Sequence, residues 1–152
     1  MNKKAQAAME FLMTYGWAIL VVIAAIAALA YFGVLDPSRM LPEKCEFPAG
    51  IDCIDKAAID ADADTVGIAL KNNIGFGMTI DDVTSDNSTN GCSVSNYTLS
   101  PTGTISNNQQ VTITVDCGSV SAGKFDETFY VTYTNAETSL QHKAVGTVRG
   151  RA

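Results

Sequence analysis

The sequence predicts an α+β protein in which a long N-terminal hydrophobic α-helix is followed by an antiparallel β-sandwich head. Residues 11–35 run without a charge between Glu10 and Asp36, which indicates one long apolar helix. From Thr65 onward, short runs rich in threonine, valine, isoleucine and tyrosine alternate apolar with polar positions, which indicates half-buried strands. We therefore expect four segments: a leader (1–5), a helix (6–35), a connector (36–64) and a sandwich domain (65–152).

The apolar segment 11–35 is long enough to cross a membrane. At about 1.5 Å per residue it is about 37 Å long, more than the roughly 30 Å hydrocarbon core of a bilayer. The apolar region of a secretory signal peptide has only about 7–15 residues, so we expect this helix to be retained. Lys3 and Lys4 precede the segment and Asp36 follows it. This bias in basic residues predicts a cytoplasmic N-terminus and an exported head.

The length and composition of the head predict a single acidic domain. The chain has a net charge of −6, and after Glu10 there are 15 acidic against 8 basic residues, a net charge of −7. Phosphate binding needs clustered Lys and Arg, so nucleic acid is disfavoured as the main partner. About 115 residues follow the apolar segment, which is enough for one domain with its own core but not for two.

The four cysteines agree with export. An even number of cysteines in a small exported domain is typical of disulfides, and three pairings are possible. Their order along the chain favours two local bridges, Cys45 to Cys53 and Cys92 to Cys117. A zinc site is the alternative, but it is disfavoured because the chain has no C-x-x-C pair and a single histidine, His142.

The first ten residues, MNKKAQAAME, carry the most specific motif of the sequence. Two lysines, a small residue and then Gln6 to Glu10 lead directly into the apolar run FLMTYGWAIL. This arrangement resembles the class III signal peptide of archaeal type IV pilins. The resemblance implies that a prepilin peptidase cuts between Ala5 and Gln6, leaving the helix on the mature protein and Glu10 as its fifth residue. Archaellin precursors share this processing, but the glycine-rich helix start that they usually have is absent, so a motility filament is disfavoured.

The resemblance also implies a function. It suggests a structural subunit of a cell-surface adhesion pilus, which is inserted in the cytoplasmic membrane as a precursor. A pilus assembly ATPase and a membrane platform would extract the trimmed subunits into a homopolymeric extracellular filament that contacts surfaces or other cells. Two alternatives remain: a minor pilin or pseudopilin of an export machine, and a single-pass anchored surface binding protein.

Glu10 is the expected assembly residue. Cleavage would expose an α-amino group at Gln6, one helical turn from the Glu10 carboxylate. A carboxylate inside a bilayer is costly, so we expect an amine to neutralise it, either its own or that of a neighbouring subunit. The pilin resemblance implies the neighbour, whose amine would fix the register between subunits. The alternative is an interfacial charge that favours the N-terminal end of the helix dipole.

Small residues follow in the second half of the helix. Ala24 and Ala28 are four positions apart, a spacing that lets helix backbones approach closely in a filament core. Alanine is also simply a good helix former, which a lone anchor would tolerate. Pro37 and Pro42 are expected to end the helix.

The connector contains two further features. Residues 54–59 are expected to form a helical turn. Asp60, Asp62 and Asp64 alternate as at the start of a calcium loop, but Thr65 and Lys71 occupy the positions where an EF-hand needs glycine and glutamate. A solvated acidic loop before a strand is therefore the favoured interpretation, and a looser calcium site is the alternative.

The head is expected to contain about six short strands separated by clusters of Gly, Asn, Ser and Pro. This number and spacing favour an antiparallel sandwich that is immunoglobulin-like in the loose sense. The predicted strands centre on residues 66–70, 78–84, 93–99, 111–115, 127–134 and 139–148.

The sequence also contains two modification motifs, and it lacks catalytic motifs. Asn87 and Asn96 both begin an N-x-S/T sequence, so both are glycosylation candidates in an exported head, and Asn87 is preferred because its surroundings are polar. No phosphate loop, nucleotide fingerprint or metal-binding helix is present in the sequence, and His142 has no partner in an arrangement of base and nucleophile. We therefore expect no catalytic residues, no metal site, no cofactor and no enzymatic activity.

Overall fold

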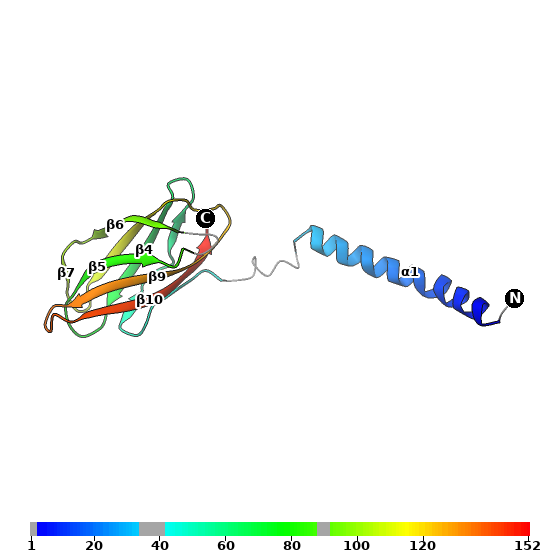
Figure 1. Cartoon of the computed structure of the whole chain (residues 1–152), viewed down its shortest axis with the longest axis horizontal. Coiled ribbons are helices and arrows are strands. Elements are labelled where there is room, and N and C mark those ends of the chain that lie inside the picture. Colours follow the sequence, from blue (N-terminus) through cyan, green and yellow to red (C-terminus); the bar gives the residue numbers. More distant parts are fainter. Residues whose placement is uncertain (1–2, 34–41, 88–91) are drawn as a thin grey trace. The chain divides into compact units, whose positions relative to one another are not determined.

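The computed structural model of the chain describes residues 3–33, 42–87 and 92–152. The contacts between residues divide the chain into two compact units, Met1–Leu41 and Pro42–Ala152. The first unit contains the single helix α1 and the second, which we call the head, contains all ten strands of the described residues (Figure 1). The predicted combination of a long apolar helix with a β-sandwich is confirmed.

Helix α1 spans Lys3–Tyr31. It therefore starts within the predicted leader. Its backbone ends in a tight turn in which the Phe32 amide donates to the Ala28 carbonyl and the Gly33 amide to the Ala30 carbonyl. Gly33 has a φ of 66°, the left-handed conformation in which glycine commonly terminates a helix. The helix thus ends at Tyr31, before the predicted end at Leu35. Leu35 and Pro37, which is expected to end the helix, lie outside the described residues.

The head consists of two antiparallel sheets. Sheet A has the strand order β1-β10-β9-β5-β7, and sheet B has the order β2-β4-β8-β6, with β3 also paired to β4. The strands of sheet A are β1 (Lys44–Glu46), β5 (Met78–Ser85), β7 (Thr104–Ile105), β9 (Lys124–Asn135) and β10 (Gln141–Arg151). Those of sheet B are β2 (Ile51–Cys53), β3 (Ala58–Asp60), β4 (Thr65–Asn72), β6 (Val94–Ser100) and β8 (Gln110–Cys117).

Along the long strands, buried apolar side chains alternate with exposed side chains, and the buried ones form the core. In β8, Val111, Ile113 and Val115 are buried, whereas the residues between them are exposed. The other central strands follow the same period, since successive side chains of a strand point to opposite faces of the sheet. Phe125 and Phe129 of β9 are both fully buried, with ring centroids 6.5 Å apart. All six predicted strands are present, with ends shifted by up to three residues.

The connector differs from its prediction. The structure has no helical turn over residues 54–59; Ala58–Asp60 instead forms strand β3, which pairs with the start of β4. Strand β1 pairs with β10 and β2 pairs with the end of β4, so the described part of the connector belongs to both sheets. Each of these strands has three residues, which is too short for an alternating pattern to be visible in the sequence.

Both predicted disulfides are present, Cys45–Cys53 and Cys92–Cys117. Cys45 lies in β1 and Cys53 in β2, so the first bridge joins sheet A to sheet B. The second bridge links Cys117, at the end of β8, to Cys92, just before β6. The two bridges therefore constrain the sandwich in different ways, one between the sheets and one along the edge of sheet B.

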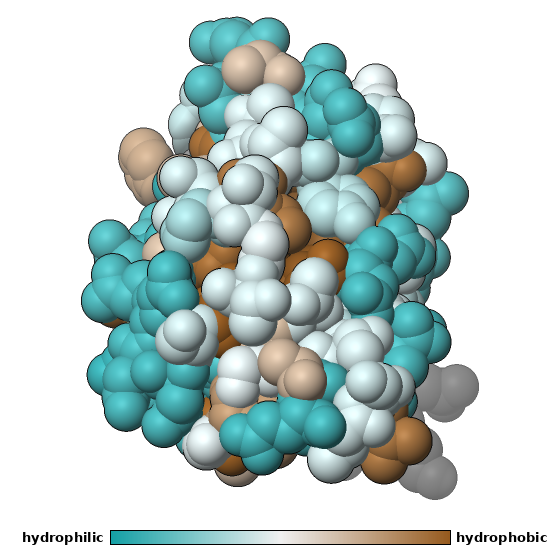
Figure 2. All heavy atoms as spheres, turned by 90° about the vertical axis from the view of Figure 1, so that its left-hand side faces the viewer, coloured by the Kyte–Doolittle hydropathy of each residue, from teal (hydrophilic) through white to brown (hydrophobic). Residues whose placement is uncertain are grey.

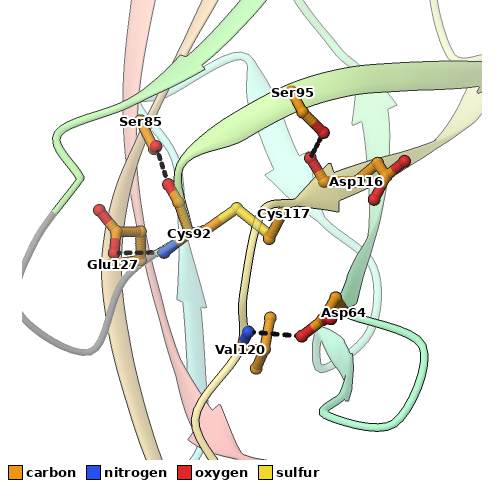
Figure 3. Close-up of a disulfide and its surroundings, with 8 residues drawn as sticks. All are labelled: Asp64, Ser85, Cys92, Ser95, Asp116, Cys117, Val120 and Glu127. Atoms are coloured by element: carbon orange, nitrogen blue, oxygen red, sulfur yellow. Dashed lines mark hydrogen bonds between the residues drawn. A yellow bond between two sulfur atoms is a disulfide. The ribbon is translucent and has the colours of Figure 1, made fainter.

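A buried carboxylate supports the second disulfide (Figure 3). Glu127 of β9 is 1% exposed, and its Oε2 accepts a hydrogen bond from the Cys92 amide at 3.2 Å. The Ser85 hydroxyl donates to the Cys92 carbonyl. Sheet A thus holds the backbone of Cys92 on both sides, while the disulfide connects the same residue to sheet B.

Candidate functional site: the N-terminal helix

Helix α1 exposes apolar side chains around its whole circumference. Ile19–Ile23 are five consecutive residues with exposed fractions of 48–61%. Five residues make more than one full turn of a helix, so no polar face exists here. A helix that is apolar on all sides is typical of a membrane span or of a core made by several helices. Gln6–Tyr31 is long enough and apolar enough to cross a membrane. Signal sequences also meet these two criteria of length and composition.

The head has a different surface. Among its described residues, the exposed large hydrophobic side chains are Ile54, Leu140 and Val145. Figure 2 shows the end of the head formed by the β9–β10 turn and neighbouring loops, where hydrophobic side chains form small areas separated by polar ones. Scattered apolar residues of this kind are normal on a soluble domain. The continuous apolar surface of the described residues is therefore that of α1.

Glu10 interrupts this apolar surface. It is the only charged residue between Lys4 and Asp36. The Thr14 hydroxyl donates to the Glu10 main-chain carbonyl at 2.9 Å, so Thr14 satisfies its own polar group on the helix backbone. The Glu10 side chain is exposed. Its carboxylate is consequently available to a partner outside the helix.

Glu10 shares one face of α1 with the predicted packing residues. Ala28 follows Glu10 by 18 positions, which is five turns at about 3.6 residues per turn, and lies about 27 Å further along the axis. Ala24 is displaced from this line by less than half a turn. Trp17 and Val21 lie between them on the same face. The helix therefore presents a stripe with a carboxylate at one end and small side chains at the other.

The predicted cleavage junction between Ala5 and Gln6 lies in the first turn of α1, since the helix begins at Lys3. Gln6 is exposed. Helical termini fray readily because their first amides have no partners within the helix. The position therefore permits local unwinding by a protease.

The two glycosylation candidates differ in their surroundings. Asn96 lies in β6, and Asn96 and Thr98 are both exposed, on the same outer side of the strand. The Asn96 Oδ1 accepts a hydrogen bond from the Tyr97 amide at 2.8 Å, which leaves the side-chain nitrogen free for modification. Asn87 is exposed with a φ of 53°, but Ser88 and Thr89 of its motif lie outside the described residues.

The acidic loop is organised by hydrogen bonds within the protein. Asp60 Oδ1 accepts from the amides of Asp62 and Ala63, and Asp64 Oδ1 accepts from the Val120 amide at 2.7 Å. Within residues 3–33, 42–87 and 92–152, no group of three or more His, Cys, Asp or Glu side chains is arranged to hold a metal ion. The carboxylates of Asp60 and Asp64 therefore help to hold the conformation of this loop.

His142, the single histidine, lies on β10 with its ring centroid 5.5 Å from that of Tyr133 on β9. Neither a carboxylate nor a hydroxyl group is hydrogen-bonded to it in the described part of the chain. The cross-strand ring contact gives His142 a packing role.

Comparison with known proteins adds no assignment: neither a protein-family model nor a curated protein sequence matches the chain. The architecture itself, one long apolar helix before a β-rich domain, is compatible with that of pilins.

Proposed function

We propose that the chain is a structural subunit of an archaeal type IV adhesion pilus that assembles through α1. The observation that carries this proposal is the helix surface, which is apolar on all sides, bears a single carboxylate and belongs to a unit separate from the disulfide-bonded head. Such a surface needs either lipid or other helices around it. A filament core supplies the helices, and the membrane supplies the lipid before assembly.

In the proposed pathway the precursor is held in the membrane by Lys3 and Lys4. Moving two ammonium groups through the hydrocarbon core is costly, so the uncut chain is locked in place. Prepilin peptidase removes the leader between Ala5 and Gln6 and so removes this lock. The assembly ATPase and its membrane platform then extract the helix into the growing filament.

Glu10 and the small residues provide the contacts in the core. The carboxylate of Glu10 pairs with the amine of Gln6 on a neighbouring subunit, which neutralises a charge that hydrocarbon would penalise. Further along the same face, Ala24 and Ala28 allow close approach of neighbouring helices. The heads then cover the filament and contact surfaces or other cells.

The N-terminal residue of the protein in surface filaments tests the proposal. Filaments are sheared from cells and their N-terminal peptide is identified by mass spectrometry. A start at Gln6 is the expected result, because it requires both processing and incorporation. A start at Met1, with the protein confined to membranes, would overturn the proposal and favour an anchored binding protein. Recovery of processed protein only in trace amounts beside another major subunit would indicate a minor pilin.

A further inference from the structure

Charged residues of the head gather into two clusters of opposite sign. We define the basic corner as Lys44, Lys124, Arg149 and Arg151. We define the acidic edge as Asp60, Asp62 and Asp116. All seven residues are exposed. Neither cluster is complete in one stretch of the sequence. Asp60 and Asp62 belong to the acidic loop but Asp116 lies in β8, and the four bases come from β1, β9 and β10.

The basic corner lies on the outer face of sheet A. Lys44 of β1 is directly opposite Arg149 of β10, and Arg151 of β10 is opposite Lys124 of β9. Arg149 and Arg151 alternate with the buried Val148, so they point away from the core. Two acids share the face: Asp126 accepts from Arg149 Nε at 3.1 Å, and Glu46 pairs with Lys44. Glu43 is also near the corner, because the charge of Arg151 contributes to lowering its pKa, and it pairs with Lys56. Five bases against three acids leave a local excess of positive charge.

The acidic edge lies on the outer face of sheet B. Asp60 of β3 is opposite Thr65 of β4, and Thr65 is opposite Asp116 of β8. With strands about 4.8 Å apart, this row places the α-carbons of Asp60 and Asp116 about 10 Å from each other. Asp62 follows in the adjoining turn. Among the described residues, no salt bridge to any of these three carboxylates is present.

Lys56 of the connector is already paired with an acid outside the acidic edge. Lys56 Nζ lies 2.8 Å from Glu43 Oε2. Their hydrogen bond, supported by their opposite charges, lowers the pKa of Glu43 and raises the pKa of Lys56. Lys71 lies at the other end of β4, opposite Gln110. The acidic edge thus keeps its negative charge.

Both clusters lie at the same end of the sandwich but face opposite ways. Asp116 is next to Cys117, the last residue of β8, and Lys124 begins β9 after a short connection. The Val120 amide in this connection binds Asp64 beside the acidic edge (Figure 3). The outer faces of two packed sheets point in opposite directions. A second head that is displaced perpendicular to the sheets can therefore bring its basic corner to the acidic edge of the first head, without a shift along the strands.

We propose that the basic corner of one head binds the acidic edge of a second copy of this chain, forming a lateral contact between neighbouring heads in the filament. The contact is heterologous, since two different surfaces meet, and heterologous contacts propagate into open assemblies. Pairing of like clusters is repulsive, which sets the direction of the contact. An anionic lipid surface fits less well, because the acidic edge at the same end of the head would be repelled by it. This inference rests on the proposed function.

Zero-length cross-linking of native filaments is the first test. Carbodiimide joins a lysine amine to a carboxylate only when the two are in contact. We expect a ladder of multimers on a denaturing gel and, by mass spectrometry, peptides joining Lys44 or Lys124 to an acidic-edge residue. The joined peptides decide the test, because the proposed Gln6 amine–Glu10 contact would also give multimers. Treated filaments without any peptide joining Lys44 or Lys124 to an acidic-edge residue would overturn the inference and leave the proposed function standing. Absence of filaments from the wild type would overturn both.

Charge reversal is the second test. The first variant, Lys124→Glu with Arg151→Glu, reverses the charge of the basic corner and keeps the Arg149–Asp126 bond. The second variant, Asp62→Lys with Asp116→Lys, reverses the charge of the acidic edge. It keeps the hydrogen bonds to Asp60 that hold the turn. We expect each pair to lower the yield of sheared filaments at least threefold and the four changes together to restore it.

A matched control separates the contact from net charge. Lys71→Glu with Lys143→Glu makes the same change in net charge as the basic-corner pair, at exposed or half-buried positions outside both clusters, and is expected to leave the yield unchanged. Thermal unfolding of the purified full-length variants in detergent shows whether the heads remain folded. Equal losses in the control and the basic-corner pair would overturn the inference, and so would a failure of the four changes to restore the yield in folded protein.

Discussion

Glu10 is the charged side chain that interrupts the apolar stretch of α1. It is the single charge between Lys4 and Asp36, and its exposed side chain lies on a helix whose exposed large side chains are mostly apolar. In a bilayer or a helical core, such a carboxylate is tolerated when a cation compensates it. In the proposed filament, Glu10 would therefore select the register between subunits, because the cost of an unpaired charge penalises every register but one.

Glu10→Ala tests this role. The substitution removes the charge and keeps good helix propensity. Export and cleavage are expected to continue, while the yield of sheared filaments falls at least tenfold, equivalent to about 1.4 kcal/mol per subunit contact. Immunoblotting of membrane and sheared fractions measures both effects. The control is Thr14→Ala, which removes a hydroxyl on the same face of the helix and should assemble normally. A normal filament yield from Glu10→Ala would show that the register between subunits is set by other residues.

Gly146 shows how closely the head is packed. It is buried in β10, and a β-carbon added there would overlap the ring of Phe47. The absent side chain at Gly146 makes room for an aromatic ring that follows β1. Overpacking of this kind costs about 1–3 kcal/mol when the surroundings must shift.

Gly146→Ala is therefore expected to lower the free energy of unfolding of the head by about 1–3 kcal/mol. Denaturant unfolding of the full-length protein in detergent measures it. Gly67→Ala is the matched control, since its β-carbon would meet Ala58 at an ordinary 3.6 Å. Combining Gly146→Ala with Phe47→Leu should recover part of the loss, and no recovery would mean that strain comes from another contact.

At the level of elements, α1 combines two kinds of surface on one face. Glu10 begins the stripe and Ala24 and Ala28 end it, whereas Ala30 lies on the opposite side of the helix, about 200° away at 100° per residue. A membrane anchor makes no distinction between these faces, because lipid contacts every side equally. A filament core does distinguish them.

Ala24→Leu and Ala28→Leu together are expected to reduce filament yield about tenfold while membrane insertion stays normal, because the larger side chains hold helix backbones apart. Ala30→Leu adds the same group on the other side and serves as the control. Filament and membrane fractions are compared by immunoblot. Equal filament yields from the wild type, the Ala24→Leu, Ala28→Leu double variant and the Ala30→Leu control would indicate that alanine at these positions acts only through helix propensity.

The elements that the sequence predicted are those whose pattern repeats. The apolar run of α1 and the six longer strands each contain enough periods to identify them. Strands β1, β2 and β3 have three residues and β7 has two, so no periodicity exists to detect. The predicted helical turn over 54–59 is wrong because pairing with β4, a tertiary contact, decides the conformation there.

For the molecule as a whole, the two disulfides stabilise the head unequally. Cys45–Cys53 closes a sequence separation of 8 residues and Cys92–Cys117 one of 25. In the chain-entropy description the longer loop removes more freedom from the unfolded chain, about 3.5 against about 2.6 kcal/mol.

Replacing both cysteines of one bridge with serine is expected to lower the free energy of unfolding more for Cys92 and Cys117 than for Cys45 and Cys53. The buried Glu127 is expected to add to the difference, because loss of the bridge loosens Cys92, whose amide donates to the Glu127 carboxylate. Denaturant unfolding of the full-length double variants under oxidising conditions gives the comparison. A larger loss on removing Cys45–Cys53 would show that the link between the sheets outweighs loop entropy.

Sequence reasoning identified the residues of the candidate site on the helix but not the clusters on the head. Glu10, Ala24 and Ala28 share one element, so their relative positions follow from helical geometry alone. Lys44, Lys124 and the two C-terminal arginines become neighbours only through the strand order β1-β10-β9. That order is decided by long-range pairing, which a local pattern does not encode.

The bridge between the sheets also has a mechanical consequence. If the proposed filament is under load, tension enters the head through the chain before Pro42 and first reaches the three-residue edge strand β1. Peeling stops at Cys45, because that residue is covalently joined to Cys53 on the opposite sheet. Both sheets then bear the force, so only the few residues before Cys45 extend before the whole head resists unfolding.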